Sequence, residues 1–214
     1  MFSSEMAELL GMHVGDGTLY ATHSSLVWEL RGDLKEKEYY NNIVAPLLYD
    51  IFKTELLPKF RSGGKNGCFG IQTCNKNLIS FFLKHGFKPG KKAKIVRIPK
   101  IIFNSKKEIQ LSFLRGYFDT DGCLRYEGIN GKKIRNYPKL EMGSLSALLI
   151  HDLETMLTKL GFNFYVWLEK RTNTSKICIA GKKMLEKWME EVKPHNPKHL
   201  NKYFQNAISS AEVA

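Results

Sequence analysis

The sequence predicts an α/β protein of the α+β type, built from two pseudo-symmetric half-domains in the order helix–strand–strand–helix–strand–strand–helix. Two observations lead to this prediction. The segment 7–19 (AELLGMHVGDGTL) recurs as segment 112–124 (SFLRGYFDTDGCL). After each copy, apolar residues alternate with the period of strands and then recur with the period of a helix. A repeated unit indicates a duplicated structure, so we expect a pseudo-two-fold axis between the halves.

The first half is expected to span residues 1–88, and it opens with a helix that ends near Asp16. Alternation predicts four strands, and wider apolar spacing predicts two further helices. The strands are expected at 17–22, 26–31, 56–61 and 67–74, and the helices at 35–53 and 75–85. Residues 89–105 are expected to form a basic linker that begins with Pro89 and Gly90.

The second half is expected to span residues 106–193 and to repeat this order with an offset close to 105 residues. Strands are expected at 123–127, 134–142, 162–171 and 175–180, with helices at 144–160 and 181–191. Residues 194–214 form a tail with a helical pattern around 199–210, for which the first half offers no counterpart. The antiparallel strands of each half should form one sheet, and the two sheets together a saddle.

The charge of the chain indicates a polyanionic partner. Its 214 residues include 33 Lys and Arg against 21 Asp and Glu, a formal net charge of +12. The excess is concentrated in Lys84–Lys100, where seven basic residues occur without an acidic one. A basic stretch alone is as compatible with a solvated linker, but the global excess favours a nucleic acid.

Several classes of protein are excluded or disfavoured by composition. Hydrophobic residues make up 43% of the chain, which is enough for a packed core. No run of eighteen apolar residues occurs, and the first ten residues lack the basic and apolar regions of a signal peptide. The four cysteines form no C-x-x-C pair, so we expect reduced cysteines and a cytoplasmic location.

Small residues recur on the two helices that open the halves. Gly11 and Gly15 are four residues apart and therefore share one helix face, and Gly116 and Thr120 hold the corresponding positions. Small residues at this spacing allow close approach of two helix backbones. We therefore expect the two helices to pack against each other at the interface between the halves.

Such packing would bring Asp16 and Asp121 together. Each acid stands before a glycine at a helix C-terminus, where the helix dipole disfavours negative charge. A single acid there would most simply be a surface residue, but two at equivalent positions repel each other unless a cation lies between them. Carboxylates select hard divalent cations, so we expect Mg²⁺.

The segments 9–17 (LLGMHVGDG) and 114–122 (LRGYFDTDG) resemble the two LAGLIDADG motifs of monomeric homing endonucleases, and the layout resembles that family over nearly the whole chain. The resemblance implies catalytic acids at Asp16 and Asp121, and metal-ligating backbone carbonyls at Gly15 and Thr120. It implies a metal-dependent double-strand break in a long DNA target with short 3′ overhangs. Mn²⁺ or Ca²⁺ could replace Mg²⁺. The family does not use the position of Asp119 in catalysis, so we expect a polar contact at the helix end.

The sheets are expected to contact DNA through side chains that alternate away from the core. These candidates are Glu29, Arg31, Lys59, Arg61, Gln72, Arg125, Arg135, Lys139, Tyr165 and Lys176. Lysines of the linker and of two helix starts are expected at phosphates, namely Lys76, Lys91, Lys92, Lys94 and Lys182. Gln72 and Lys182 are the candidate catalytic helpers, with Lys176 competing with Lys182. The spacing of His195 and His199 could suit a metal, but no cysteine pair accompanies it.

Two other classes of function remain open. The chain could be an intron-encoded RNA splicing maturase, or a regulator that binds DNA without cutting it. Neither class requires paired acids, yet both Asp16 and Asp121 are present. Their presence favours the endonuclease, although maturase activity can coexist with cleavage.

Overall fold

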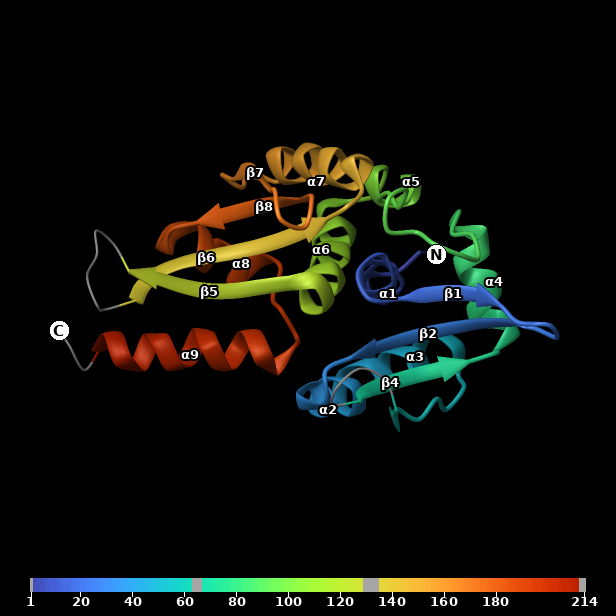
Figure 1. Ribbon diagram of the computed structural model, residues 1–214. Helices are drawn as coiled ribbons and strands as arrows, with labels where there is room; N and C mark the ends of the chain where they lie inside the picture. The colour runs from blue at the N-terminus through green and yellow to red at the C-terminus, as the bar shows by residue number, and fades with distance from the viewer. Residues whose placement is uncertain (1, 63–66, 129–134, 212–214) are drawn as a thin grey trace.

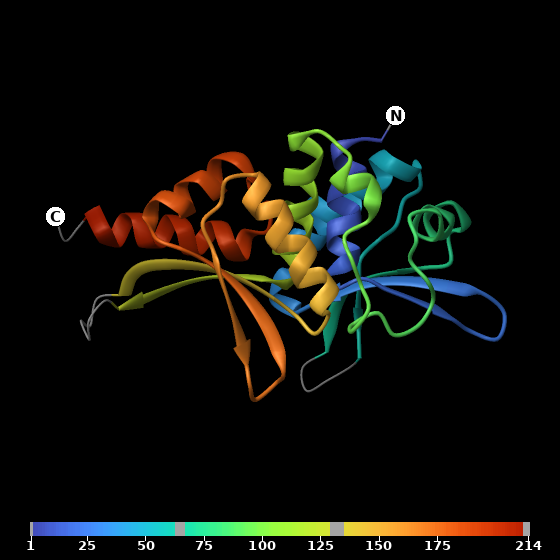
Figure 2. The same cartoon turned by 90° about the horizontal axis from the view of Figure 1, so that it is seen from above.

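The computed structural model describes residues 2–62, 67–128 and 135–211, with the side chains of 135 and 207–211 outside the description. Two four-stranded antiparallel sheets lie side by side, with strand orders β1-β2-β4-β3 and β5-β6-β8-β7. The helices α1 and α6 stand between the sheets (Figure 1). The other helices lie on one side of the sheets and leave the opposite faces of both sheets uncovered (Figure 2). The predicted α+β fold with two related halves is confirmed.

The N-terminal half begins with α1 (Ser4–Val14), which the hydroxyl of Ser3 caps by accepting from the backbone N–H of Met6. Strands β1 (Thr18–Ala21) and β2 (Leu26–Gly32) form a hairpin. After the next helical segment, β3 (Lys59–Arg61) and β4 (Cys68–Thr73) complete the sheet. The half ends with α4 (Lys76–Lys84), capped by the side chain of Asn75.

The predicted helix at 35–53 consists of four joined pieces. They are η1 (Leu34–Glu36), α2 (Lys37–Tyr39), the π-helical turn η2 (Tyr40–Val44) and α3 (Ala45–Phe52). Asp33 and Glu36 begin the run with a capping box. Tyr39 and Tyr40 are adjacent in the sequence, and both are buried where the π-helical turn begins. The wider turn places both rings against the core. The strand predicted at 56–61 is shorter than expected, since β3 covers only its last three residues.

The C-terminal half repeats the arrangement with longer elements. Its order is α6 (Lys107–Asp121), β5 (Gly122–Gly128), β6 (Arg135–Ser144), α7 (Ala147–Lys159), β7 (Tyr165–Glu169), β8 (Thr174–Ala180) and α8 (Lys182–Glu191). The tail forms α9 (Pro197–Ala211), which lies along the edge strand β5 (Figure 1). None of the helices in the described ranges is long and apolar enough to cross a membrane.

The predicted linker is partly structured. It contains the short helix α5 (Lys100–Phe103), and it is fixed to α7 by Arg97, whose guanidinium Nη2 lies 2.7 Å from Asp152 Oδ1. The backbone N–H of Ile98 also donates to Asp152. The connection between the halves is therefore tied to the C-terminal half.

Two glycines set the distance between α1 and α6. A Cβ atom on Gly11 would lie 2.1 Å from the carbonyl oxygen of Phe113, and one on Gly116 would lie 2.0 Å from that of Glu8. Neither position has room for a side chain, so the helix backbones touch at both. Around this contact Leu9, Leu10 and Leu114 are fully buried. The predicted close packing of the two helices is confirmed.

Candidate active site

The closely packed helices bring Asp16 and Asp121 to one place. Asp16 follows the end of α1, and Asp121 is the last residue of α6. A Cβ atom on Gly15 would lie 3.5 Å from Cβ of Asp121 and 2.1 Å from Oγ1 of Thr120. The two helix ends are therefore in contact immediately before the acids. Each acid is followed by a glycine that begins the turn into a strand.

The two carboxylates influence each other's ionisation. Burial, and then the charge of Asp121, raise the pKa of Asp16 to about 7. Burial also raises the pKa of Asp121, while the nearby ammonium groups of Lys92 and Lys198 act to lower it. Asp121 keeps contact with solvent, although the protein around it is dense enough to disfavour the ionised form. Two neighbouring acids that both have raised pKa values are typical of a functional site.

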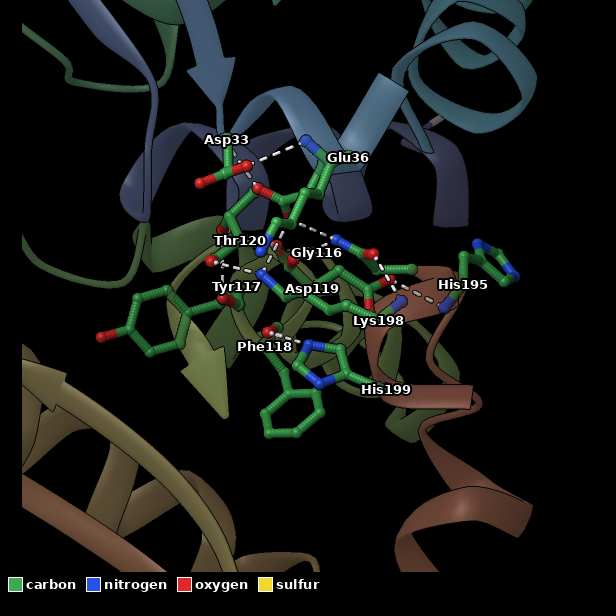
Figure 3. A network of polar contacts seen from close by, with 12 residues as sticks. Asp33, Glu36, Gly116, Tyr117, Phe118, Asp119, Thr120, His195, Lys198 and His199 are labelled. Carbon is green, nitrogen blue, oxygen red and sulfur yellow. Dashed lines mark hydrogen bonds and ion pairs between the residues drawn. The ribbon is translucent and has the colours of Figure 1, made fainter. Parts of the chain in front are cut away.

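A lysine lies against the carbonyl before each acid. Lys92 Nζ donates to the carbonyl oxygens of Val14 and Gly15, at 2.6 Å each. Lys198 Nζ donates to the carbonyl oxygen of Thr120 at 3.1 Å (Figure 3). Each ammonium therefore meets the negative end of a helix dipole and stands close to the acid that follows.

The donor set at the two helix ends fits a divalent cation. It combines two carboxylates with the carbonyl oxygens of Gly15 and Thr120, all hard oxygen ligands of the kind that Mg²⁺ prefers. Burial is the first cause of the raised pKa of Asp16 and the charge of Asp121 the second, and a cation bound between the two acids would relieve this repulsion. In this structure the two lysines supply positive charge at the same carbonyls.

A groove of about 1600 Å³ runs from Asp16 over the uncovered face of the N-terminal sheet. Most of the residues predicted for this half line it: Gly15, Asp16, Glu29, Arg31, Arg61, Gln72, Lys91, Lys92 and Lys94. The strand register accounts for this, because residues opposite each other on neighbouring strands point to the same face. Glu29 stands opposite Gln72, and Gly70 stands between Arg31 and Lys59. The strand residues predicted for this half therefore lie on one face of the sheet.

Two of these residues differ in detail from the expectation of freely outward side chains. Glu29 is only 6% exposed, and its carboxylate lies 3.6 Å from the guanidinium of Arg31. Gln72 donates from its amide to the hydroxyl of Tyr20, which also lines the groove. Tyr20 is a groove residue that the alternation pattern did not single out.

The C-terminal sheet presents its predicted residues on one face, but in ion pairs. Arg125 on β5 stands opposite Lys139 on β6 in the strand register. Tyr165 on β7 and Lys176 on β8 lie on the same face of the sheet. Arg125 lies 2.6 Å from Glu141, Lys139 lies 2.6 Å from Glu127, and Lys176 lies 3.2 Å from Glu169. The side chain of Arg135 lies outside the described residues.

The predicted phosphate contacts stand at exposed positions. Lys76 and Lys182 begin α4 and α8, and Lys91 and Lys94 flank Lys92 in the groove. Lys182 was also the candidate helper of the second half, but its ammonium lies out in solvent, 4.0 Å from Glu186 on its own helix. The structure places Lys198, rather than Lys182, beside Asp121.

Lys198 was missed because the tail was expected to lack a counterpart in the first half. The segment 88–92 (KPGKK) and the segment 193–198 (KPHNPK) occupy equivalent positions, with one residue inserted in the second. Lys92 and Lys198 are therefore a repeated pair. The signal was present in the sequence, but the insertion shifts the offset from 105 to 106 and hides it.

Two further residues near the motifs serve packing. His13 is buried between Phe82 and Phe87, and its Nδ1 accepts from the indole N–H of Trp28 at 3.1 Å. Burial lowers the pKa of His13 well below its usual value, so the imidazole is neutral. Asp119 makes the predicted helix-end contact, since its carboxylate accepts from the backbone N–H of His195 at 2.8 Å. The four cysteines are free, with Cys74 and Cys123 exposed.

Comparison with known structures gives the class of fold. The chain superposes on I-DmoI in complex with DNA and Mn with a TM-score of 0.62 and 18% identity, over 90% of this chain and 98% of that one. The homing endonuclease I-WcaI bound to its DNA recognition sequence gives a TM-score of 0.61 and 18% identity, over 93% and 85%. The I-LtrWI LAGLIDADG homing endonuclease bound to target DNA gives 0.62 and 12%, over 97% and 90%. The fold is that of the LAGLIDADG homing endonucleases.

The sequence of residues 108–193 matches the family described as LAGLIDADG-like domain. This match lies within the C-terminal half, and the whole chain has the fold of the LAGLIDADG homing endonucleases. Among curated proteins, the chain is 28% identical over 205 residues to the replication factor C small subunit of Methanocaldococcus jannaschii. It is 24% identical over 175 residues to the DNA polymerase II large subunit of Thermococcus kodakarensis. The chain spans 10% and 8% of these relatives, so the activities in their names belong to proteins about ten times longer.

Proposed function

We propose that this chain is a site-specific homing endonuclease that makes a metal-dependent double-strand break in a long DNA target. The proposal rests on one observation above all. Asp16 and Asp121, at equivalent ends of two touching helices, form a single site between two sheet faces that present basic side chains. One chain supplies both acids, so a monomer would be sufficient for the reaction.

The acids and the carbonyls of Gly15 and Thr120 would hold Mg²⁺, or Mn²⁺ or Ca²⁺ in its place. Structures of I-DmoI have been solved with DNA and Mn, with Mg and with Ca. A bound divalent cation would supply a more acidic water and neutralise charge on the phosphate and on the leaving oxygen. The chain has one acid for each DNA strand, which matches two cuts.

Lys92 and Lys198 would contribute fixed positive charge beside the acids. Their ammonium groups favour the ionised carboxylates, which is the form that binds a cation. The same groups are within reach of a scissile phosphate placed between the helix ends, where they would stabilise the charge that develops during hydrolysis. Gln72, which lines the groove over the N-terminal sheet, would assist the hydrolysis.

Recognition is assigned to the two uncovered sheet faces. The net charge of +12 would favour the DNA backbone, and the strands would present side chains to base edges in the major groove. The known structures of I-WcaI and I-LtrWI were determined with bound DNA, in support of this arrangement. Because the acids stand together, the scissile phosphates would face each other across the minor groove, which gives short 3′ overhangs.

The test is cleavage of a library of long duplex sites in the presence of Mg²⁺, followed by sequencing of the cut ends. We expect recurrent ends with short 3′ overhangs at one long sequence. The matched control is the double variant Asp16→Asn with Asp121→Asn. It should lose cutting by about a thousandfold or more and keep DNA binding, because the amides keep the shape of the acids and lose their charge.

Two results would contradict the proposal. Cutting by the double variant at the wild-type rate would remove the acids from the reaction. No cutting by the wild-type protein, together with selective retention of a structured RNA or of uncut DNA, would favour the maturase or the regulator.

A further inference from the structure

A second cluster of potential metal ligands lies away from the acid pair, where α1 and α6 meet the segment that leads into α9. It consists of Glu8, Asp119 and His195. Nδ1 of His195 lies 2.8 Å from Oε1 of Glu8, and the three ligand atoms lie within 4.8 Å of one another. Asp119 is two residues before Asp121 on a helix, so the two side chains point in nearly opposite directions. The cluster is therefore separate from the catalytic candidates.

The cluster is buried and holds polar atoms without partners. Glu8 is 3% exposed and Asp119 is fully buried. Oδ1 of Asp119 and the hydroxyl of Tyr39 have no hydrogen-bond partner among the described residues. Burial, and then the charges of Asp119 and Glu8, raise the pKa of Tyr39 well above its usual value. Buried polar atoms are rarely left unsatisfied, because each then loses its hydrogen bonds to water without replacement.

The charges leave a place for a cation. Arg115 Nη1 lies 2.9 Å from Oε2 of Glu8 and occupies that oxygen only. At the cluster, Asp119 Oδ2 accepts from the backbone N–H of His195, and Asp119 Oδ1 has no partner among the described residues. The 2.8 Å contact between His195 Nδ1 and Glu8 Oε1 is a hydrogen bond, and a metal ion bound by both atoms would take the place of its proton. Two ligand atoms on one zinc ion are separated by about 3 Å or slightly more, so a small opening of this contact would suffice.

We propose that Glu8, Asp119 and His195 bind one divalent transition-metal ion of the zinc class, with the hydroxyl of Tyr39 or a water as fourth ligand. A mixed set of imidazole and carboxylate is a set that Zn²⁺ accepts, whereas a set of oxygen atoms only selects Mg²⁺. The ion would join both helices of the interface to the segment before α9.

Such an ion would fix the position of Lys198. His195 is three residues before Lys198, and Asn196 between them donates to Glu36 at 2.8 Å and to the carbonyl oxygen of Asp119 at 2.9 Å (Figure 3). Lys198 itself lies 2.9 Å from Glu36. The segment is thus held to both halves, and the metal would add a further attachment at His195, whose side chain is 39% exposed.

The experiment uses the full chain with Asp16→Asn and Asp121→Asn, so that the acid pair does not contribute to metal binding. The protein is stripped with a chelator and titrated with Zn²⁺ by calorimetry and with Co²⁺ by visible absorption. We expect one equivalent of each metal, a Co²⁺ spectrum of a four-coordinate site, and a higher melting temperature with Zn²⁺. His195→Gln added to this background should weaken binding at least about tenfold.

His151→Gln is the matched control, since His151 is an exposed histidine on α7, and it should leave the affinity unchanged. Asp119→Asn is the second test variant, and circular dichroism verifies that each variant is folded. Absence of stoichiometric Zn²⁺ binding would overturn the proposal and would assign the contact to a hydrogen bond between His195 and Glu8 alone. Binding that is equally tight in His195→Gln and Asp119→Asn would overturn it as well, because the ion would then lie elsewhere.

Discussion

The two halves of the molecule have equivalent acids and lysines at the candidate active site and differ in the ion pairs on their sheet faces. Each half places an acid at a helix end, and each has a lysine on the carbonyl before that acid. On the N-terminal face, Lys59, Arg61 and Lys94 make no ion pair with any described residue. On the C-terminal face, three cations are held by glutamates, in the pairs Arg125–Glu141, Lys139–Glu127 and Lys176–Glu169.

The difference shows which parts of a duplicated fold can change independently. The helix contact is constrained on both sides, because neither Gly11 nor Gly116 has space for a Cβ atom. The sheet faces point away from this contact, and their side chains can vary without disturbing it. A target read by such a protein need not be palindromic, since the two faces differ in their free cations, although Arg31 on the N-terminal face also lies 3.6 Å from Glu29.

Replacement of one lysine at a time gives the largest effect expected from this comparison. Lys92→Met should slow the cutting of one DNA strand by about a hundredfold or more, and Lys198→Met should slow the other, because Lys92 donates to the carbonyl before Asp16 and Lys198 to the carbonyl before Asp121. Supercoiled plasmid carrying the target should therefore accumulate as nicked circles with either variant. If both variants slow the two strands equally, the lysines act on one shared centre rather than on one half each.

The glycines give an intermediate effect, measured as stability. Gly116→Ala forces a Cβ atom against the backbone of Glu8, so we expect a loss of about 2–4 kcal/mol in denaturant unfolding. Gly15→Ala meets Oγ1 of Thr120, which is a side chain, so the loss should be recovered in part by Thr120→Ala. No single side-chain truncation should rescue Gly116→Ala. Equal rescue at both positions would show that the helices move apart more easily than their contact indicates.

Much of the fold could be predicted because the pattern repeats. The strand alternation gave the faces of Arg31, Lys59 and Arg125 correctly, since the period of a strand determines side-chain direction locally. The π-helical turn at Tyr40–Val44 could not be predicted, because it depends on how two adjacent tyrosines pack against a core formed by distant residues. The ion pairs of the C-terminal face also depend on which strands become neighbours.

The candidate site, like the fold, could be predicted in part from the repeat. Two aspartates at equivalent positions identified its centre, because a repeat makes an isolated coincidence less probable. The segment 193–198 was not recognised as part of it, since an inserted residue hides its match to segment 88–92. Its contacts with the site are with residues 76 or more positions earlier in the chain, and periodicity does not report contacts of that range.

The smallest effect concerns salt, and Lys59 and Lys139 form the matched pair that tests it. Both stand on the uncovered face of their sheet, but Lys139 already lies 2.6 Å from Glu127. A free cation that meets a phosphate releases about one counterion, whereas a cation already paired with a carboxylate releases less. In the background of Asp16→Asn with Asp121→Asn, Lys59→Gln should therefore reduce the slope of log affinity against log salt by about 0.9. Lys139→Gln should change the slope by less than half as much. Equal changes would show that DNA breaks the Lys139–Glu127 pair on binding, and the charge difference between the two faces would then be a property of the free protein alone.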